Sequence, residues 1–444
     1  MQLPKYVLDC VNALEAAGFE AWAVGGCVRD ACLGITPHDY DLCTNALPDT
    51  IQEVFSGYDL VLAGKKHGTV SVITRGGLVE ITTFRTEGGY RDNRHPDWVE
   101  IVSEITGDLA RREFTVNAMA WSPPRGFADP FGGRQELKNR VLRAVGDPVR
   151  RFEEDSLRIH RGVRFAVRYR LALDGATERA MGAKAHLMEN LARERVFDEL
   201  CKLLPLAEAE DLLRFAPILA AVIPELAPMI GFDQHNPHHA YDLYTHTAQV
   251  CAGVPPQLAL RWAGLLHDVG KVPTFTLDAN GRGHFYGHAQ VSAEMADAIL
   301  RRLKAPTALR EEVVFLIDKH MAVFEPDRKL LRRWISRWGV DRVIRLHALQ
   351  QADFGSKGTG GADRVSWFDM IAGIIDSIRE EDACLSLKDL AVNGRDIMAL
   401  GLRGKAVGDC LNRLLARVVD EVLPNEKEAL LQAAKEMMTE GASI

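Results

Sequence analysis

The chain has 444 residues and a formal net charge of −7, with 47% of its residues hydrophobic and 26% charged. This length favours two to four domains, and the composition is ordinary for a soluble globular protein. No apolar run approaches the roughly 18 residues of a membrane span, so no membrane partner is expected. The N-terminal stretch lacks a secretory core and the eight cysteines lack CxxC spacing, which favours reduced thiols and a cytoplasmic protein.

Two kinds of pattern divide the chain. Up to about residue 140, short apolar runs such as AWAV, TVSVIT and LVEITTF alternate with turn signals, which predicts an α/β region with a small sheet. From about residue 141 onward, long amphipathic segments replace the strand signals, so the remainder is predicted to be helical. The His-rich stretch 230–246 indicates a junction, and the glycine-rich stretch 355–363 separates the last helical region.

The first candidate site lies in the stretch GGCVRDACLGITPHDYDL, residues 25–42. If DYDLC forms a strand, the side chains of Asp39 and Asp41 point to the same face. Two adjacent carboxylates favour a hard divalent cation such as Mg²⁺, whose shell substrate phosphates complete. Gly25 and Gly26 let backbone N–H groups approach a phosphate just before a helix. A DxD pattern alone is more often a surface turn, but this combination predicts a metal and phosphate site.

Two stretches of the chain are basic, although the net charge of the whole chain is negative. Residues 134–170 hold eleven Lys and Arg against five Asp and Glu, and a second basic run spans residues 327–345. An isolated run of this kind is usually a solvated helix face. Two such runs in a chain with a carboxylate site favour a polyanionic partner.

The stretch EEDSLRIHR, residues 153–161, is predicted to be one continuous helix. Spacings of three and four residues would then place Glu154, Asp155, Arg158 and Arg161 on one face. The opposite, core-facing side would carry Phe152, Ile159, Val163 and Ala166. Taken alone, the charged face is as readily explained by a ladder of ion pairs, worth roughly a few tenths of a kcal/mol, as by a ligand site.

A second candidate metal site lies in the helical region, around an adjacent His–Asp pair in LLHDVGK. Nitrogen and carboxylate ligands together suit a divalent transition metal or Mg²⁺. The residues expected to bind one ion are His246, His267, Asp268 and Asp353, and those available for a second are His288 and His320. Their order resembles the HD phosphohydrolase superfamily. The resemblance implies hydrolysis of phosphomonoesters or phosphodiesters, including cyclic phosphates at RNA ends.

Several stretches together resemble the class II tRNA nucleotidyltransferases, that is, the CCA-adding enzymes. They also resemble the related bacterial poly(A) polymerases. The matching stretches are GGCVRD (25–30), HDYDL (38–42), DLARREFTVNAMA (108–120), EEDSLRIHRGVRFA (153–166), RVFDEL (195–200) and LAVNGRDIMALGLRGKAVG (390–408). One departure is Glu113, where the family usually has Asp. Because a Glu side chain reaches further, Glu113 is left out of the expected metal ligands.

The resemblance implies a role for each residue of the motifs. Asp39 and Asp41 would be the catalytic pair that binds Mg²⁺. Asp155 and Arg158 would pair with the Watson–Crick edge of the incoming base, with Glu154 supporting Arg158. Arg111 and Arg112 would meet the phosphates or the base, and Asn117 either the sugar or the motif's own turn. The nucleotide-binding set that it implies is Gly25, Gly26, Arg29, Arg111, Arg112, Asn117, Asp155, Arg158 and Arg161.

The template role agrees with base chemistry. A carboxylate accepts from the exocyclic amine of cytosine or adenine, and a guanidinium donates to ring acceptors. Uracil and guanine place a carbonyl where that amine should be, which leaves Asp155 unpaired at a cost of about 1–3 kcal/mol. The resemblance therefore implies template-independent addition of CCA to the 3′ end of tRNA, using CTP, ATP and two Mg²⁺ ions, with an added phosphatase or cyclic phosphodiesterase activity left open.

The fold implied is a polymerase-β-like α/β head with a small mixed sheet, followed by all-α neck, body and HD-type domains. The expected regions are a nucleotidyltransferase head (1–142), a helical neck with template and RNA-binding residues (143–229), an HD domain (230–360) and a C-terminal helical tRNA-binding region (361–444). The expected partners are tRNA, CTP and ATP, with no DNA and no membrane.

Three alternatives remain. The first is a poly(A) polymerase or an enzyme that adds only CC or only A. Against it, LAGKKHGTVSV (62–72) resembles the CCA enzymes, and the polar stretch 86–100 resembles the flexible loop that full CCA enzymes use to change from C to A. The second is an HD phosphohydrolase whose head merely binds nucleotide, which the intact Asp39 and Asp41 pair disfavours. The third, a non-enzymatic RNA-binding module, is disfavoured by two complete metal constellations.

Overall fold

The structure of the chain is a computed structural model, which describes residues 1–88, 98–236, 240–357, 362–381 and 383–441. The packing of its backbone divides the chain into two compact units. The first unit comprises Met1–Ala227 with Arg302–Ala305, and the second comprises Pro228–Arg301 with Pro306–Ile444. No helix within the described ranges combines the length and the apolarity needed to cross a bilayer.

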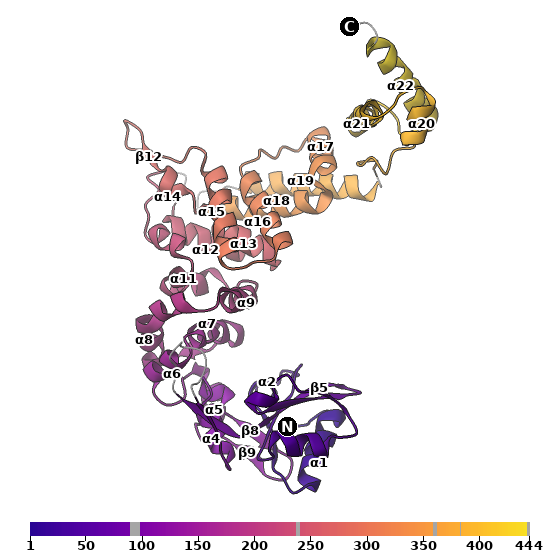
Figure 1. The fold of residues 1–444 in the computed structure, drawn as a ribbon. Coiled ribbons are helices and arrows are strands. Elements are labelled where there is room, and N and C mark those ends of the chain that lie inside the picture. Colours follow the sequence, from indigo (N-terminus) through magenta and orange to yellow (C-terminus); the bar gives the residue numbers. More distant parts are fainter. Residues whose placement is uncertain (89–97, 237–239, 358–361, 382, 442–444) are drawn as a thin grey trace. The chain divides into compact units, whose positions relative to one another are not determined.

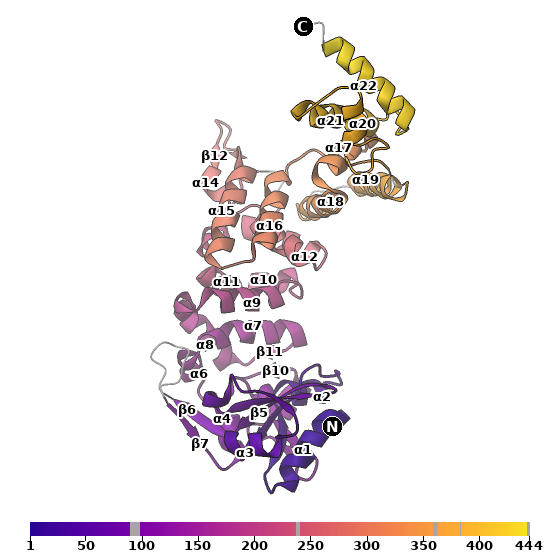
Figure 2. The ribbon, with the colours of Figure 1, turned by 45° about the vertical axis from the view of Figure 1, so that its right-hand side comes forward.

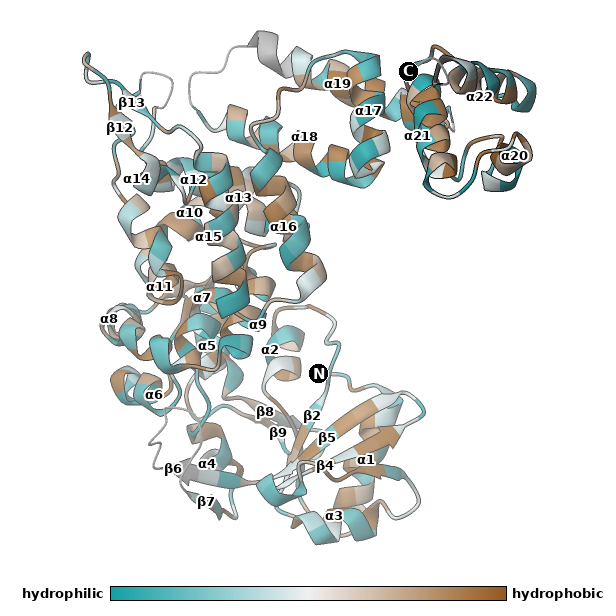
Figure 3. Cartoon of the chain, turned by 45° about the horizontal axis from the view of Figure 1, so that its top comes forward, coloured by the Kyte–Doolittle hydropathy of each residue, from teal (hydrophilic) through white to brown (hydrophobic). Residues whose placement is uncertain are grey.

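A mixed sheet forms the centre of the N-terminal part of the first unit (Figure 1). Within the described residues it has seven strands in the order β3-β4-β5-β2-β1-β8-β9, and β2 and β5 pair in parallel. The strands are β1 (Ala21–Val24), β2 (Asp41–Thr44), β3 (Asp59–Val61), β4 (Thr69–Thr74), β5 (Gly77–Thr83), β8 (Ala120–Ser122) and β9 (Gly126–Ala128). Figure 3 shows apolar residues along β4 and β5, where Val72 and Ile81 are fully buried. The small mixed sheet predicted for this region is confirmed.

Short helices surround the sheet. They are α1 (Lys5–Ala16), α2 (Gly26–Cys32), α3 (Pro48–Val54), α4 (Ile105–Ala110) and α5 (Gly133–Asn139), with the 3₁₀ turns η1 (Lys65–His67) and η2 (Thr115–Asn117). The stretch 86–100, which was predicted to be a flexible loop, begins and ends in a pair of antiparallel strands, β6 (Arg85–Gly88) and β7 (Trp98–Ile101). Residues 89–97 between them lie outside the described residues.

Helices then follow one another to the end of the first unit (Figure 2). They are α6 (Pro148–Glu154), α7 (Leu157–Tyr169), α8 (Gly175–Lys184), α9 (Arg193–Leu203), α10 (Ala209–Arg214) and α11 (Ala216–Val222), with η3 (Ala185–Asn190) and η4 (Pro224–Met229). Helix α7 packs on α9, where Arg164 and Glu199 form a buried ion pair at 2.5 Å. The predicted change to helix near residue 141 is confirmed, apart from the two-residue strands β10 (Val141–Leu142) and β11 (Ala172–Leu173), which pair in parallel.

The second unit is helical around α18, which contacts α12, α13, α16, α17 and α19. Its helices are α12 (Leu243–Gly253), α13 (Leu258–Leu266), α14 (Lys271–Thr274), α15 (His288–Arg302), α16 (Thr307–Lys319), α17 (Arg328–Trp338), α18 (Val340–Gly355) and α19 (Ala362–Glu380). A small hairpin, β12 (Thr276–Leu277) and β13 (Gly283–His284), precedes α15. The fully buried ring of Trp262 on α13 belongs to the core of these helices.

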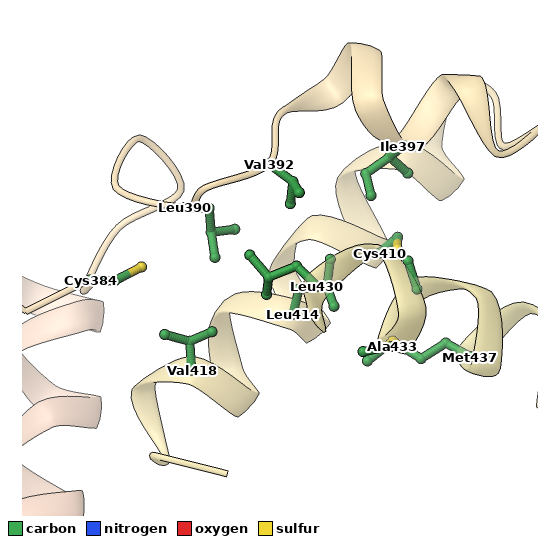
Figure 4. Close-up of a cluster of buried hydrophobic side chains, with 11 residues drawn as sticks. Cys384, Leu390, Val392, Ile397, Cys410, Leu414, Val418, Leu430, Ala433 and Met437 are labelled. Carbon is green, nitrogen blue, oxygen red and sulfur yellow. The ribbon is translucent and has the colours of Figure 1, made fainter. Parts of the chain in front are cut away.

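Three further helices follow α19: α20 (Gly394–Ala399), α21 (Lys405–Val419) and α22 (Lys427–Gly441). Their apolar faces form a separate buried cluster, in which Ile397, Leu414 and Leu430 are fully buried (Figure 4). The guanidinium of Arg332 on α17 donates to the backbone carbonyls of Val418 and Val419, at 3.2 and 2.7 Å. Because Arg332 is buried, these carbonyls accept hydrogen bonds from guanidinium N–H groups that solvent cannot reach.

Candidate functional site

Strand β2 begins at Asp41, so it is shorter than the predicted DYDLC strand, and Asp39 lies just before it. The predicted alternation nevertheless holds, because Tyr40 and Leu42 are buried while the side chains of Asp39 and Asp41 are exposed. Asp41 pairs in register with Val24, the residue that precedes the Gly25 turn. The two predicted carboxylates and the glycine turn therefore meet at one end of the sheet.

A third carboxylate, Glu80, joins this end of the sheet and was not predicted. It lies on β5, directly in register with Asp41 across the parallel β2–β5 pair. Partial loss of hydration and then the negative charge of Glu80 raise the pKa of Asp41, while Arg112 lowers it. Three oxygen-bearing side chains of like charge suit a hard divalent cation such as Mg²⁺. The only local signal in the sequence was a charged residue, Glu80, between the apolar residues Val79 and Ile81.

Gly25 has φ 72° and ψ −124°, a conformation that L side chains rarely adopt. A Cβ atom there would lie 2.6 Å from Nη1 of Arg112, so a side chain at this position would also displace the guanidinium of Arg112. The N–H of Gly25 donates to the carbonyl of Met119 at 3.2 Å. This N–H therefore bonds within the turn, and the phosphate-binding role of Gly25 and Gly26 stays a prediction. Gly26 is the first residue of α2.

Arg111 and Arg112 are held by one buried carboxylate, that of Asp108. Nη2 of Arg111 lies 2.8 Å, and Nη2 of Arg112 lies 3.2 Å, from the Asp108 oxygens. Burial alone would raise the pKa of Asp108, but the two guanidinium groups lower it below its usual value. Asp108 thus stays ionised and aligns both arginines, with Arg112 lying against the Gly25 turn.

A second hydrogen-bond network centres on Asn117 and Glu113. The buried Arg29 donates to Oδ1 of Asn117 and to the hydroxyl of Tyr169, both at 2.6 Å. Asn117 donates to Oε1 of Glu113 at 2.9 Å, and Arg161 donates to the same oxygen at 2.7 Å. The network therefore links α2, the motif at 108–120 and α7. Glu113 holds Asn117 and Arg161, and this agrees with its exclusion from the metal ligands.

The continuous helix predicted for residues 153–161 is wrong. Helix α6 ends at Glu154, Asp155 has an extended backbone (φ −143°, ψ 103°), and α7 begins at Leu157. Oδ1 of Asp155 accepts the N–H of Leu157 at 3.0 Å, a local bond that competes with the helical pattern. The other Asp155 oxygen accepts from Arg195 at 3.2 Å, so the i,i+3 pairing with Arg158 does not form in this structure.

Arg158 is nevertheless held as expected. Its Nη1 donates to Oε2 of Glu154 at 2.7 Å and to the carbonyl of Arg151 at 3.0 Å. Its Nη2 donates to the carbonyl of Arg111 at 3.2 Å. Arg158 therefore connects the α6–α7 junction to the arginine pair. The predicted core side of this region is buried throughout, at Phe152, Ile159, Val163 and Ala166.

In the second unit, six predicted metal ligands converge from α12, α13, α15, α16 and α18. They form two possible ligand groups that share Asp268, the first with His246 and His267 and the second with His288 and His320. Asp353 lies beside the first group, with Oδ1 at 3.0 Å from Nε2 of His246. His267 follows the last residue of α13, so the helix ends at the His–Asp pair, and both side chains are almost fully buried.

The histidines are oriented by backbone carbonyls. Nδ1 of His246, His267, His288 and His320 lies 2.6 to 3.2 Å from a carbonyl oxygen of Ser356, Gly264, Phe285 and Ile317 respectively. A carbonyl only accepts, so each neutral ring carries its proton on Nδ1 and presents the Nε2 lone pair inward. Nε2 of His288 and Nε2 of His320 are 3.3 Å apart. Two lone pairs this close repel unless a cation lies beside them, so the donor set fits a second metal ion.

The charges of the cluster also favour metal binding. Burial lowers the pKa of His320 to about 4 and lowers that of His288, so both rings are neutral at pH 7. Burial alone would raise the pKa of Asp268, but His267 and Lys271 hold it well below its usual value. Burial alone would lower the pKa of His267, but Asp268 raises it above its usual value, so His267 must lose a proton when it binds a metal. Neutral imidazoles and ionised carboxylates are the forms that bind metals. Lys271, whose Nζ lies 2.8 Å from Asp268, was not predicted, and its only sequence signal was its position three residues after the pair.

Comparison with known proteins covers most of the chain. Family models match four stretches: "Poly A polymerase head domain" at residues 21–143, "Probable RNA and SrmB- binding site of polymerase A" at 170–230, "HD domain" at 238–353 and "tRNA nucleotidyltransferase domain 2 putative" at 365–434. The first of these contains Asp39, Asp41 and Glu80, and the third contains all six residues of the metal cluster.

Curated relatives match along the whole chain. A CCA-adding enzyme of Ligilactobacillus salivarius is 31% identical over 98% of this chain and 97% of its own length. One of Levilactobacillus brevis is 34% identical over 95% of each chain. The crystal structure of the Bacillus stearothermophilus CCA-adding enzyme in complex with CTP is 26% identical, with a TM-score of 0.72 over 100% of this chain and 99% of that one.

Proposed function

We propose that this chain, which belongs to the family of CCA-adding enzymes, completes the 3′ end of tRNA by adding C, C and A from CTP and ATP without a nucleic-acid template. The observation that carries the proposal is the placement of Asp39 and Asp41 at one end of the sheet, with Glu80 in register with Asp41 and with Arg112 against the Gly25 turn. Metal ligands and arginines in one site suit a nucleoside triphosphate. Membership of the CCA-adding family supports a tRNA partner, and no DNA partner is proposed.

Asp39 and Asp41 are the proposed ligands of two Mg²⁺ ions, with Glu80 as a third carboxylate at the same end of the sheet. When bound, Mg²⁺ activates the attacking 3′ hydroxyl and neutralises the charge of the leaving pyrophosphate. The exposure of Asp39 and Asp41 supports this role, because a triphosphate can reach them from solvent.

Arg111 and Arg112 are proposed to contact the triphosphate, aligned by the buried Asp108. Arg29 is buried and bonded to Asn117 and Tyr169, so its proposed role is to position Asn117 rather than to touch the nucleotide directly. Arg161, which lies on α7, is oriented by its hydrogen bond to Glu113. These contacts would fix the nucleotide-facing groups before the substrate binds, which lowers the cost of binding.

Asp155 and Arg158 are proposed to select the base. Arg158 is fixed by Glu154 and by two backbone carbonyls, so its orientation is largely set. Asp155 lies in the short extended segment between α6 and α7 and is bonded to Arg195. Selection therefore requires the Asp155 carboxylate to exchange part of its bonding to Arg195 for the exocyclic amine of cytosine or adenine.

The direct test uses a tRNA that lacks its 3′ CCA, incubated with Mg²⁺ and with each nucleoside triphosphate in turn. CTP alone should add two residues, and CTP with ATP should add three, while UTP and GTP should add none. Repeated addition of A from ATP alone would identify a poly(A) polymerase. Extension that stops at CC with both nucleotides present would identify a partial enzyme.

A second activity is proposed for the metal cluster of the second unit, namely metal-dependent hydrolysis of phosphoesters, including 2′,3′-cyclic phosphates at RNA ends. The close pair of inward-facing histidine nitrogens, at 3.3 Å, favours two metal ions there. Two ions can polarise a phosphate and lower the pKa of bound water. Nickel, manganese or magnesium are the candidates, and metal analysis of the purified protein tests their binding directly.

The proposed compartment is the cytoplasm. All eight cysteines have free thiols, and several, including Cys43 and Cys251, are buried. Burial raises the pKa of the Cys251 thiol to about 12, which keeps it unreactive. A reducing compartment suits such thiols.

A further inference from the structure

Two hollows meet at the metal cluster of the second unit. The first, of about 210 Å³, is lined by Asp268 and His288 of the cluster and by His284, Phe285 and Tyr286. The second, of about 300 Å³, is lined by Val323, Phe354, Trp367 and Phe368. Both are lined by His320, Met321, Asp353 and Lys357. Because metal-facing residues belong to both walls, the cluster lies where the hollows join and is open to each of them.

The first hollow has a flat aromatic wall. Tyr286 is 77% exposed, and its ring stacks on that of His284 with centroids 5.3 Å apart and an angle of 5° between planes. Nε2 of His284 lies 3.1 Å from Asp278, which fixes the supporting ring. An exposed aromatic face held from behind is a suitable surface for a nucleobase, because every base has a flat π face.

The second hollow is apolar at its rim and aromatic inside. Met321 is 56% and Val323 is 70% exposed at this rim, which is unusual beside a cluster of histidines and carboxylates. The rings of Phe354 and Phe368 pack at 6.0 Å, and Trp367 on α19 lines the same wall. These apolar and aromatic side chains, which share the lining with the polar groups of Gln350, Asp353 and Lys357, suit a second organic group.

Two lysines flank the junction of the hollows. Nζ of Lys271 lies 2.8 Å from Asp268, and Nζ of Lys357 lies 3.3 Å from Asp353. Both lysines line the first hollow, and Lys357 lines the second as well. Ammonium groups beside the cluster can bind the oxygens of a phosphate that lies at the metal ions.

We propose that this centre hydrolyses a linear nucleotide phosphodiester with a nucleoside on each side of the phosphate, as at an RNA 3′ end, in preference to a small phosphomonoester or a cyclic mononucleotide. The inference rests on the hydrolase function proposed above for the same cluster. Water oxygen bonds to phosphorus and the P–O bond to one nucleoside breaks. One water proton ends on the leaving oxygen and the other is released or stays on the new phosphate. One base lies on Tyr286, and the other nucleoside lies against Trp367.

The test compares three substrates with the full chain and Mn²⁺: cytidylyl-3′,5′-adenosine, 2′,3′-cyclic CMP and p-nitrophenyl phosphate. The dinucleotide should have the highest kcat/KM, by about tenfold or more if stacking contributes at both bases.

Tyr286→Ala and Trp367→Ala should each raise KM for the dinucleotide by about tenfold, with little change in kcat. Hydrolysis of p-nitrophenyl phosphate should change much less, because this substrate has one small ring and cannot contact both surfaces. Leu277→Ala is the matched control, because Leu277 is exposed on the same hairpin but lines neither hollow, and it should change nothing.

The possible failures are distinct. If the cyclic nucleotide or p-nitrophenyl phosphate is cleaved at least as well as the dinucleotide, the substrate class is wrong while the hydrolase function stands. If Tyr286→Ala and Trp367→Ala reduce cleavage of all three substrates equally, the two-sided binding is wrong. If the protein binds Mn²⁺ and cleaves none of the three, the hydrolase function and this inference both fall.

Discussion

Asp41 experiences several charges at once at the start of β2. Partial loss of hydration and the neighbouring Glu80 raise its pKa, Arg112 lowers it, and Asp39 raises it further. Carboxylates gathered in this way repel one another, and a divalent cation removes the repulsion. The site is therefore destabilised without metal, and each carboxylate should matter far more for nucleotide addition than for folding.

Replacing Asp41 tests this directly. Asp41→Asn keeps the shape of the side chain but removes its charge, and we expect nucleotide addition to fall by about a thousandfold or more, because metal stabilisation of the transition state is worth several kcal/mol. Binding of tRNA, measured by filter retention, should be unchanged. Asp59→Asn, at an exposed position on β3, is the control and should keep full activity. Normal turnover in Asp41→Asn would exclude Asp41 as a metal ligand.

Asp155 is expected to govern the choice of base. Asp155→Ala removes the acceptor of the exocyclic amine, so misincorporation of UTP and GTP relative to CTP should rise about 5- to 100-fold, as expected for one unpaired polar group. Affinity for the triphosphate should change less, because the proposed phosphate contacts are Arg111 and Arg112. Single-turnover assays with each nucleotide measure both quantities. A variant that rejects UTP as strongly as the parent would end the template role.

At the scale of elements, the junction of α6 and α7 shows what local patterns could not predict. Helical spacing correctly predicted the buried face and the Glu154–Arg158 pair. It failed at Asp155, because a short acidic side chain bonds the N–H two residues on and ends the helix. The partner Arg195 lies on another helix, so periodicity within residues 153–161 carried no information about it.

Helix α7 should make the first unit sensitive to acid. His160 is buried on α7, and burial lowers its pKa to about 4 from an ordinary value near 6.5. The neutral form folds, so His160 contributes stability above pH 6.5 that is lost as the pH falls towards 4, to a limit of about 3 kcal/mol. His160→Asn should show a smaller loss in the unfolding of the first unit, as measured by urea unfolding at pH 7.5 and 5, while the loss due to His320 in the second unit stays. The exposed His186 is the control, and a parent-like pH dependence in His160→Asn would contradict the account.

The two candidate sites were predicted from sequence to different degrees. The strand period predicted the common face of Asp39 and Asp41. The order of His and Asp residues predicted the five residues that form the two possible ligand groups, and Asp353, which lies 3.0 Å from His246. Metal binding by these six residues stays a prediction. Glu80 was missed because it reaches Asp41 only through the parallel pairing of β2 with β5, which no local pattern reports. Asp108 and Glu113 were missed as organisers because their partners come from separate segments of the chain.

At the scale of the whole molecule, the two sites belong to different compact units. Asp39, Asp41 and Glu80 lie in the first unit, and the six residues of the metal cluster lie in the second. The division near residue 227 is a property of the packing, while the four functional regions proposed from sequence stay a prediction. Because the two sites lie in separate units, we expect that the activity of one site can be removed without loss of activity at the other site.

His267→Ala with Asp268→Ala tests that separation. We expect loss of bound transition metal and of all phosphoester hydrolysis, because Asp268 is shared by both ligand groups. Addition of C and A to tRNA should stay within about twofold of the parent, since the substitutions leave the first unit unchanged. Metal analysis and hydrolysis of 2′,3′-cyclic CMP are the measurements, and circular dichroism checks folding. Hydrolysis that survives without the pair would place that activity elsewhere.

The most direct test of the central claim is the sequence of the product end. The full chain is incubated with a tRNA that lacks its CCA end, all four nucleoside triphosphates and Mg²⁺, and the 3′ ends are sequenced. The account predicts that nearly every extended molecule ends in CCA and stops there, although UTP and GTP are present. Ends of any other sequence, continued addition of A, or no extension while the tRNA is bound would contradict it.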